Sequence, residues 1–282
     1  MNTKTLSIRD TDSVRRAPLR STIDQSGLLS GDRLLGVIEL LMRSDVPLSA
    51  RAIAEIVGIN RSTTHRAINT LIHRGWVERV PNASEYRLSI KFLALAHVAT
   101  QERSFLHEVR PVLDALLAVY RETVHMGILD GLEVLHVDKI DSLERVGVAS
   151  KIGSRGPAHT ASLGKALLAA SSDEIVERYI AEATTGHGAD QLADLEGFRE
   201  EIALTRQRGY SIDDEEDAPG VRCLGVAVRG ADGAPLFAIS LTGPSARFTL
   251  ERVIAAAPRL VEITRQLSVR LGWEPENSAI RR

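Results

Sequence analysis

Residues 47–89 read PLSARAIAEIVGINRSTTHRAINTLIHRGWVERVPNASEYRLS, and this stretch decides the fold of the N-terminal part of the chain. It predicts two short helices joined by a tight turn and followed by a β-hairpin. That order is the layout of a winged helix-turn-helix, a unit that presents one helix to the major groove of double-stranded DNA. The sequence therefore predicts a DNA-binding protein.

Capping residues mark the limits of the two helices. Ser49 and Asn60 can each accept an orphan amide hydrogen bond at a helix start, and Gly58 can adopt the positive φ of the turn between them. Gly75 ends the second helix. The hairpin, which we expect to be the wing, comprises strands at residues 76–79 and 86–88 around a Pro-Asn-Ala-Ser turn.

Apolar residues recur at helical spacing and predict which faces point inward. The inward residues are Leu34, Val37, Ile38 and Leu41 in a first helix (32–44), Ile53, Ile56 and Val57 in the second (49–57), and Ile68, Leu71 and Ile72 in the helix after Asn60. Side chains of the opposite face are of types that bond phosphates and base edges. The expected DNA contacts are Arg61, Ser62, Thr63, Thr64, Arg66 and Asn69, with Arg51, Arg74, Arg79 and Arg87 as further basic candidates.

Charge favours DNA binding over the alternative, an ordinary helical pair with a solvated polar face. Residues 51–91 hold seven Lys and Arg against three Glu, a net charge of +4. Residues 1–90 hold 13 basic and nine acidic residues, again +4, whereas the remainder holds 22 and 28, or −6. A basic end on a net-acidic chain suits a polyanionic partner.

The whole chain has the composition of an ordinary soluble protein. It has 282 residues, 44% of them hydrophobic and 26% charged, which is enough for two domains. Its start is polar rather than signal-like, and no apolar run approaches the roughly 20 residues needed to span a membrane. Because Cys223 is the one cysteine, an intrachain disulfide and a cysteine metal cluster are excluded. We expect a cytoplasmic protein with no membrane contact and no cofactor, since nucleotide-loop and HExxH motifs are absent.

Composition shifts along the chain predict five segments. A disordered arm has three arginines (Arg15, Arg16, Arg20) that could touch DNA, although a solvated tail is the simpler interpretation. The apolar segment IKFLALAHVATQER has no turn residues, so a helical linker is expected. The expected segments are the arm (1–27), the winged helix-turn-helix domain (28–90), the helical linker (91–104), a C-terminal domain (105–272) and a tail (273–282).

From Thr123 onward, strand-like and helix-like patterns predict an antiparallel sheet covered by helices, an α+β domain. The expected strands are 124–129, 134–137, 145–152, 224–229 and 235–242, and the expected helices are 105–121, 160–171, 173–183, 194–208 and 249–271.

Three loops of this domain carry residues that could form a pocket. In the first, residues 153–165, Thr160 is the expected cap of a helix whose free amides near Ser162 and Leu163 favour an anion. In the second, five acids at 213–217 are typical of a solvated face, and they lack the spacing of a calcium loop. The third, residues 240–244, places two hydroxyls on one face of a strand. Plain helix capping and ordinary strand polarity explain the first and third equally well.

An enzyme interpretation would make Cys223 a nucleophile and His159 its base, but nothing in the sequence orients the pair. A lone cysteine is more often a small buried apolar residue. We therefore expect no catalytic residues and no metal site.

Together these motifs resemble the isocitrate-lyase-regulator (IclR) family of bacterial transcription factors. The matching stretches are LSARAIAEIVGINRSTTHRAINTLIHRGWVER, YRLSIKFLALA, HTASLGKALLA, RGYSIDDEEDAPGVRCLGVAV and AISLTGPSARFT, in the family's order over about residues 30–272. The resemblance implies a winged helix domain, a helical linker and, over residues 105–272, a GAF-like α/β domain for effector binding and oligomerisation. It also implies a homodimer or dimer of dimers on a palindromic operator, often repressing a catabolic operon in response to a carboxylate or aromatic acid.

By the same resemblance, effector contacts fall at Val148, Gly156, Ser162, Leu163, Asp213, Val221, Cys223, Ser240 and Thr242. Ser162 and Leu163 stand where some carboxylate-sensing members have small residues, so pocket volume and ligand may differ. Two alternatives stay open: a C-terminal domain that only oligomerises and binds no small molecule, and an enzyme with a regulatory head.

Overall fold

The computed structural model describes residues 29–101, 105–185 and 192–275. The expected arm (1–27) lies outside these residues, so its interpretation as disordered is not tested. The chain forms two compact units that divide between residues 103 and 104. The elements of the N-terminal unit are α1 (Leu29–Arg43), β1 (Leu48–Ser49), α2 (Ala50–Val57), α3 (Arg61–His73), β2 (Val77–Arg79), β3 (Glu85–Leu88) and α4 (Lys91–Gln101).

The predicted caps of the N-terminal unit are confirmed. Ser49 accepts a 3.2 Å hydrogen bond from the amide of Ala52, and Asn60 accepts one of 2.9 Å from the amide of Thr63. Gly58 has a φ of 73°, which lets the chain turn between α2 and α3 without steric cost. Three-helix packing and the β2–β3 hairpin follow as expected, with the short β1 strand added at the edge of the hairpin.

Two predicted inward residues are wrong. Ile56 and Ile72 are 42% and 38% exposed, whereas the core of the unit is built from residues such as Val37, Ile53 and Ile68, each fully buried. Each exposed isoleucine lies next to a turn, at the end of an apolar stripe, where the helix leaves the three-helix core. Helical spacing therefore predicted the buried stripe but not how far along the helix it continues.

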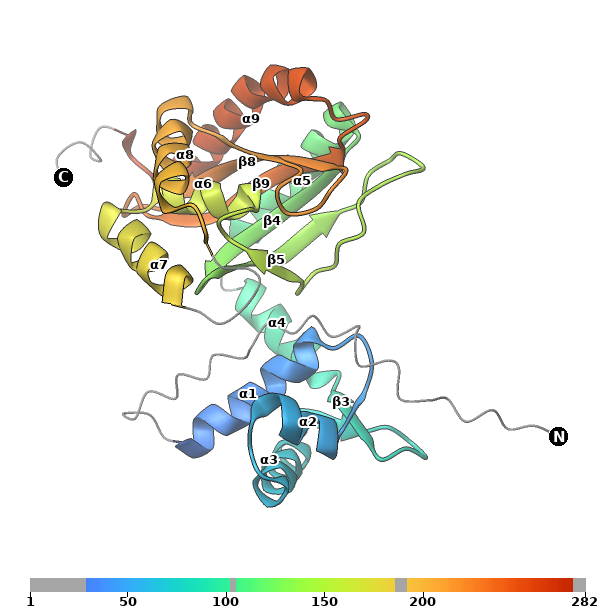
Figure 1. Ribbon diagram of the computed structural model, residues 1–282. Helices are drawn as coiled ribbons and strands as arrows, with labels where there is room; N and C mark the ends of the chain where they lie inside the picture. Colours follow the sequence, from blue (N-terminus) through green and yellow to red (C-terminus); the bar gives the residue numbers. More distant parts are fainter. Residues whose placement is uncertain (1–28, 102–104, 186–191, 276–282) are drawn as a thin grey trace. The chain divides into compact units, whose positions relative to one another are not determined.

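The C-terminal unit is a six-stranded antiparallel sheet with helices on both faces (Figure 1). Strand order is β6-β5-β4-β9-β8-β7, so β6 and β7 are the two edges. Helices α5 and α9 cover one face, and α6, α7 and α8 pack on the other. Its elements are α5 (Phe105–Tyr120), β4 (Thr123–Asp130), β5 (Glu133–Ile140), β6 (Arg155–Pro157), α6 (Ser162–Ala170), α7 (Asp173–Thr185), α8 (Leu195–Arg208), β7 (Ser211–Asp214), β8 (Val221–Arg229), β9 (Pro235–Pro244) and α9 (Leu250–Arg270).

Helix α6 approaches the sheet very closely because a glycine lies beneath its first residue. A methyl group placed on Gly225 of β8 would lie 2.5 Å from the carbonyl oxygen of Ser162, closer than packing allows. The hydroxyl of Ser211 donates a 2.6 Å hydrogen bond to that same carbonyl. These contacts fix where the N-terminus of α6 meets the sheet.

Three expectations for the C-terminal unit are wrong. Residues 145–152 form no strand, and β6 begins only at Arg155 because the intervening loop is held by side-chain contacts instead. Thr160 does not cap α6: its hydroxyl donates to Pro157 O, and the N-cap is Ala161, which has no side-chain cap. The acidic run is not wholly solvated, since Asp213 lies on β7 and is 1% exposed.

None of the helices among the described residues is both long and apolar enough to cross a membrane.

Candidate functional site

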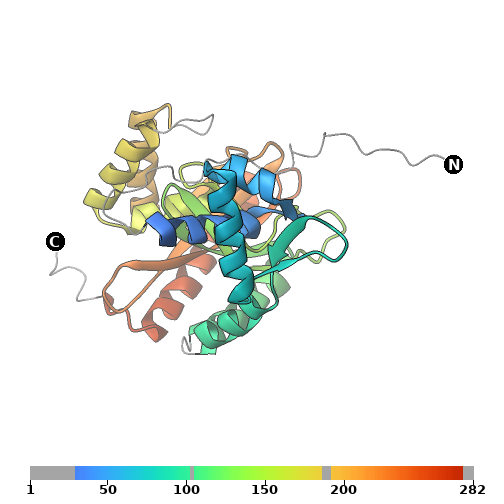
Figure 2. The same ribbon diagram turned by 90° about the horizontal axis from the view of Figure 1, so that it is seen from below.

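The outer face of α3 carries most of the predicted DNA contacts. Arg61, Ser62, Arg66 and Asn69 are exposed, and Thr63 is half-buried. Figure 2 shows α3 and the hairpin within the N-terminal unit. Side chains at positions three and four apart share one helix face, so this exposed polar surface is continuous.

Thr64 is the exception, and its predicted place on the outer face is wrong. Its side chain is fully buried, and its hydroxyl donates a 3.1 Å hydrogen bond to the carbonyl oxygen of Asn60. The side chain therefore holds the helix start instead of facing solvent. Sequence reasoning also overlooked His65, which is exposed; it lies four residues after Arg61, a spacing that places it on the outer face.

The other basic candidates are exposed, and two of them have acidic partners. Arg51 forms a 2.8 Å ion pair with Glu55 one turn along α2, and Arg87 pairs with Glu78 across the hairpin at 2.6 Å. Arg74 is exposed at the C-terminal end of α3. Exposed pairs such as these contribute little to stability, so both arginines can exchange their partner for a phosphate.

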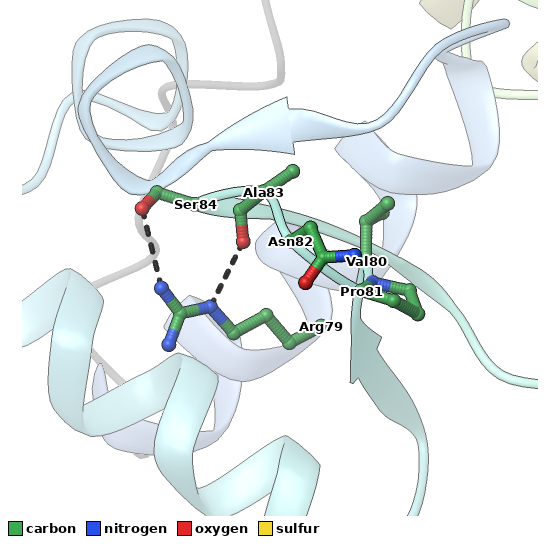
Figure 3. A pocket seen from close by; sticks show the side chains of 6 residues that line it. All are labelled: Arg79, Val80, Pro81, Asn82, Ala83 and Ser84. Carbon is green, nitrogen blue, oxygen red and sulfur yellow. Dashed lines mark hydrogen bonds between the residues drawn. The ribbon is translucent and has the colours of Figure 1, made fainter.

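The tip of the wing surrounds a shallow hollow lined by residues 79–84 (Figure 3). Arg79 bends back across it, donating hydrogen bonds of 3.0 Å to Ala83 O and 3.2 Å to Ser84 Oγ. Asn82 has a φ of 60°, which asparagine tolerates better than most residues. The guanidinium of Arg79 is thus ordered at the exposed end of the hairpin.

In the C-terminal unit, several predicted effector residues meet on the sheet face that packs against α6. Asp213 of β7 pairs in register with Cys223 of β8, which pairs with Thr242 of β9. Ser240 lies two residues before Thr242 on the same face, and their hydroxyl oxygens are 3.4 Å apart. The four residues form a buried polar floor.

Two histidines extend this floor, and sequence reasoning missed both. His125 of β4 lies between two hydroxyls, with Nδ1 3.2 Å from Thr242 Oγ1 and Nε2 2.6 Å from Ser150 Oγ. The ring of His136 on β5 lies edge-on, with its centre 4.9 Å from that of His125. The alternation of the two predicted strands could have revealed them, because His125 falls on the face opposite the core residues Val124 and Met126.

Burial sets the charge of the floor. It lowers the pKa of His125 to about 3, an effect to which nearby His136 and Lys139 add, and it also lowers the pKa of His136. Burial raises the pKa of Asp213 to about 6 and that of the Cys223 thiol well above its usual value. At neutral pH the floor therefore has two neutral imidazoles, a neutral thiol and one carboxylate.

The remaining predicted effector residues border the floor. Ser162 and Leu163 begin α6, whose first amides have no partner within the helix and no side-chain cap. Gly156 is buried on β6, and Val221 begins β8. Val148 is half-buried in the loop that also brings Ser150 to His125.

In the structure, the two residues of the enzyme interpretation each contact a different side chain. His159 Nδ1 lies 2.9 Å from the hydroxyl of Tyr179, whereas the side chain of Cys223 bonds Asp213. In the part of the chain that the structure describes, no group of three or more His, Cys, Asp or Glu residues could hold a metal ion.

Comparison with known proteins agrees over both units. The profile of the IclR helix-turn-helix domain matches residues 30–81, and that of the bacterial transcriptional regulator IclR C-terminal domain matches residues 97–269. The transcriptional repressor IclR of Escherichia coli is 29% identical over 261 residues, covering 91% of this chain and 95% of the relative. The regulator KdgR of Dickeya chrysanthemi is 28% identical over 249 residues, with coverage of 87% and 76%.

Solved structures show the same fold. A putative IclR regulator from a Silicibacter species superposes with a TM-score of 0.77 at 25% identity, covering 88% of this chain and 98% of that one. An IclR homologue from Microbacterium hydrocarbonoxydans, solved with 4-hydroxybenzoate, gives 0.69 at 21% identity, with coverage of 84% and 98%. The curated relatives named above are DNA-binding regulators rather than enzymes, and the chain belongs to the IclR family of bacterial transcriptional regulators.

Proposed function

We propose that this protein is a ligand-responsive repressor of a catabolic operon in the bacterial cytoplasm, and that a small organic acid controls it. The observation that carries the proposal is the buried polar floor beside an uncapped helix start. Few structural reasons require a sheet face to bury Asp213, His125 and Thr242 together, since each buried polar group is costly unless it is bonded.

The geometry favours a ligand with an acid at one end and a hydrogen-bond donor at the other. The free amides at Ser162 and Leu163 suit a carboxylate. Asp213 would repel that carboxylate but accept a hydrogen bond from a hydroxyl or amide. The 4-hydroxybenzoate in the structure of one relative carries an acid and a hydroxyl of this kind, which supports an aromatic acid as one candidate class.

DNA recognition is assigned to the outer face of α3, with the wing arginines on the phosphate backbone. Arg61, Ser62, Arg66 and Asn69 are the proposed base and phosphate contacts of α3. Arg79 and Arg87 are the proposed backbone contacts of the wing, with Arg51 and Arg74 as further phosphate contacts.

A homodimer, or a dimer of dimers, on a palindromic operator fits both the family and the surface of α4. Ile90, directly before this linker helix, and Leu93, Leu95 and Val98 within it have exposed fractions from 51% to 79%. Such apolar exposure on one helix is typical of an interface. Two heads are also needed because one winged head contacts too few base pairs for useful specificity.

A thermal-shift screen tests ligand sensing. The panel is short aliphatic carboxylates, 2-oxo acids and benzoates with and without a hydroxyl. A binder at a concentration 100 times its Kd stabilises the folded state by about 2.7 kcal/mol, a clear rise in Tm. A panel without any hit, together with oligomers that persist, would favour the alternative in which the domain only oligomerises.

A further inference from the structure

The segment that joins β7 to β8, residues 215–220, comes close to β6 at the opposite edge of the sheet. We call this segment the strap. It starts at β7, yet a methyl group placed on Gly156 of β6 would lie 3.5 Å from Oδ1 of Asp217. Because β6 and β7 are the two edges of the sheet, one side chain of this hairpin loop approaches the edge opposite to the one where the loop begins.

The strap passes over the polar floor. The carboxylate of Asp217 acts electrostatically on three floor residues that come from three different strands: His136, Asp213 and Cys223. These side chains belong to β5, β7 and β8, and the amide of Asp217 itself lies 3.3 Å from Oδ1 of Asp213, so the strap lies close to this part of the floor.

One buried lysine holds the strap down. Lys165 of α6 is 1% exposed, and its Nζ lies 2.6 and 2.8 Å from the two carboxylate oxygens of Glu216. Glu201 of α8 is a more distant second partner at 3.7 Å. A buried ammonium without a partner is strongly unfavourable, so Lys165 stabilises the position in which the strap contacts the helix. Glu216 is 42% exposed and returns to water readily when released.

The floor holds the strap from the other side. Oδ1 of Asp213 accepts hydrogen bonds from the amides of Glu216 (2.9 Å) and Asp217 (3.3 Å). A ligand group that donates to Asp213 therefore meets a carboxylate already bonded to the strap. Ligand contact and strap position are coupled through this one side chain.

We propose that the strap is the cover of the effector site and that Lys165 is the positioning residue that keeps it closed through Glu216. The proposal rests on the proposed effector site. A ligand enters when Glu216 leaves Lys165, and the returning strap then excludes water from the ligand.

The reactivity of Cys223, the chain's one cysteine, can show whether the strap is open or closed when no ligand is present. It lies on the floor and is 8% exposed, so alkylation by N-ethylmaleimide measures how often the strap opens. The variants are Lys165→Met, which keeps the length of the side chain, and Glu216→Gln, which alters only the strap. Glu201→Gln is the matched control, because it removes the other carboxylate near the same ammonium.

In the full-length protein we expect Lys165→Met and Glu216→Gln to raise the alkylation rate about tenfold or more, the effect of losing a charged hydrogen bond. In the same two variants, hydrogen exchange should be faster at residues 215–220 and unchanged in α9. Glu201→Gln should behave as wild type. If Lys165→Met fails to fold, the alkylation rate of Glu216→Gln alone tests the proposal.

Equal alkylation rates in wild type and in every folded variant would overturn the proposal. Faster alkylation in a protein that binds no acid of the screening panel would instead uphold the strap and count against the proposed function, so the two failures are distinguishable.

Discussion

The ammonium group of Lys91 lies 4.3 Å from the centre of the Trp76 ring and donates a 2.8 Å hydrogen bond to the carbonyl oxygen of Arg74. Arg74 is the C-terminal cap of α3, so the first turn of the linker helix holds the end of the helix assigned to DNA. Ser89 adds a 2.5 Å hydrogen bond to Gly75 O, and the Phe92 ring packs 5.0 Å from Trp76. A rotation of α4 must therefore move the C-terminal end of α3.

Lys91→Met should destabilise the N-terminal unit, because it removes a cation–π contact and a cap of the α3 carbonyls. The expected loss is about 1 kcal/mol in the free energy of unfolding, measured by urea denaturation. Arg51→Met, which removes only an exposed ion pair within one helix, should leave the free energy of unfolding close to that of wild type. An equal loss in both variants would show that the junction adds nothing.

Thr64→Ala should act on folding and not on DNA contact. The change leaves a small cavity and removes the hydrogen bond to Asn60 O, so we expect a loss of about 1–2 kcal/mol in unfolding free energy. Thr63→Ala on the neighbouring, half-buried position is the comparison and should cost less. The prediction is contradicted by a Thr64→Ala variant as stable as wild type that fails to bind DNA.

Two buried groups should give opposite pH dependence. The pKa of Asp213 rises from 3.8 to about 6 on folding, so between these values the folded state binds the proton more tightly and stability falls as pH rises. The pKa of His125 falls from 6.5 to about 3, so there the unfolded chain binds the proton more tightly and stability rises with pH. Each slope approaches about 1.4 kcal/mol per pH unit, and the two oppose each other between about pH 4 and 6.

Removing one of these two groups should reveal the pH dependence of stability that the other causes. On acidification from pH 6 to 4, Asp213→Asn should lose stability relative to wild type by about 2 kcal/mol, and His125→Gln should gain by a similar amount. Urea denaturation at both pH values measures this. Parallel pH profiles for wild type and both variants would mean that neither group is perturbed by burial.

Ser240→Ala should weaken binding of a screened acid about tenfold, because the ligand loses a hydroxyl partner on the floor. Isothermal calorimetry measures the Kd. Ser171→Ala, at the far end of α6, removes a hydroxyl without touching the floor and should bind as wild type. If the two variants bind equally well, the site is misplaced.

Local chemistry made the N-terminal unit predictable. Ser49, Gly58 and Asn60 act on the backbone within three or four residues, so their sequence positions determine the two helices. The assignment of Thr64 failed because the limit between the buried and exposed faces depends on how α3 packs on α1 and α2, which is a tertiary property.

Long-range pairing limited what could be predicted of the C-terminal site. The sequence pattern placed Asp213 in a solvated acidic run. In the structure it is buried on β7, where it pairs with Cys223 of the neighbouring strand. His125 and His136 lie within correctly predicted strands, but their role depends on the strand order that brings β4 beside β9. Family resemblance named Asp213, Cys223, Ser240 and Thr242, and the structure adds His125 and His136 beside them.

Selection of genomic DNA fragments by the full-length protein tests the central claim most directly. Wild type should enrich a small set of fragments that share an inverted repeat, since a symmetric oligomer places two α3 helices on the DNA. A variant with Arg61→Ala and Arg66→Ala should lose this enrichment, at about 1–3 kcal/mol for each base contact removed, while Arg199→Ala on the C-terminal unit keeps it. No enrichment by wild type, or equal enrichment by the double variant, would contradict the account.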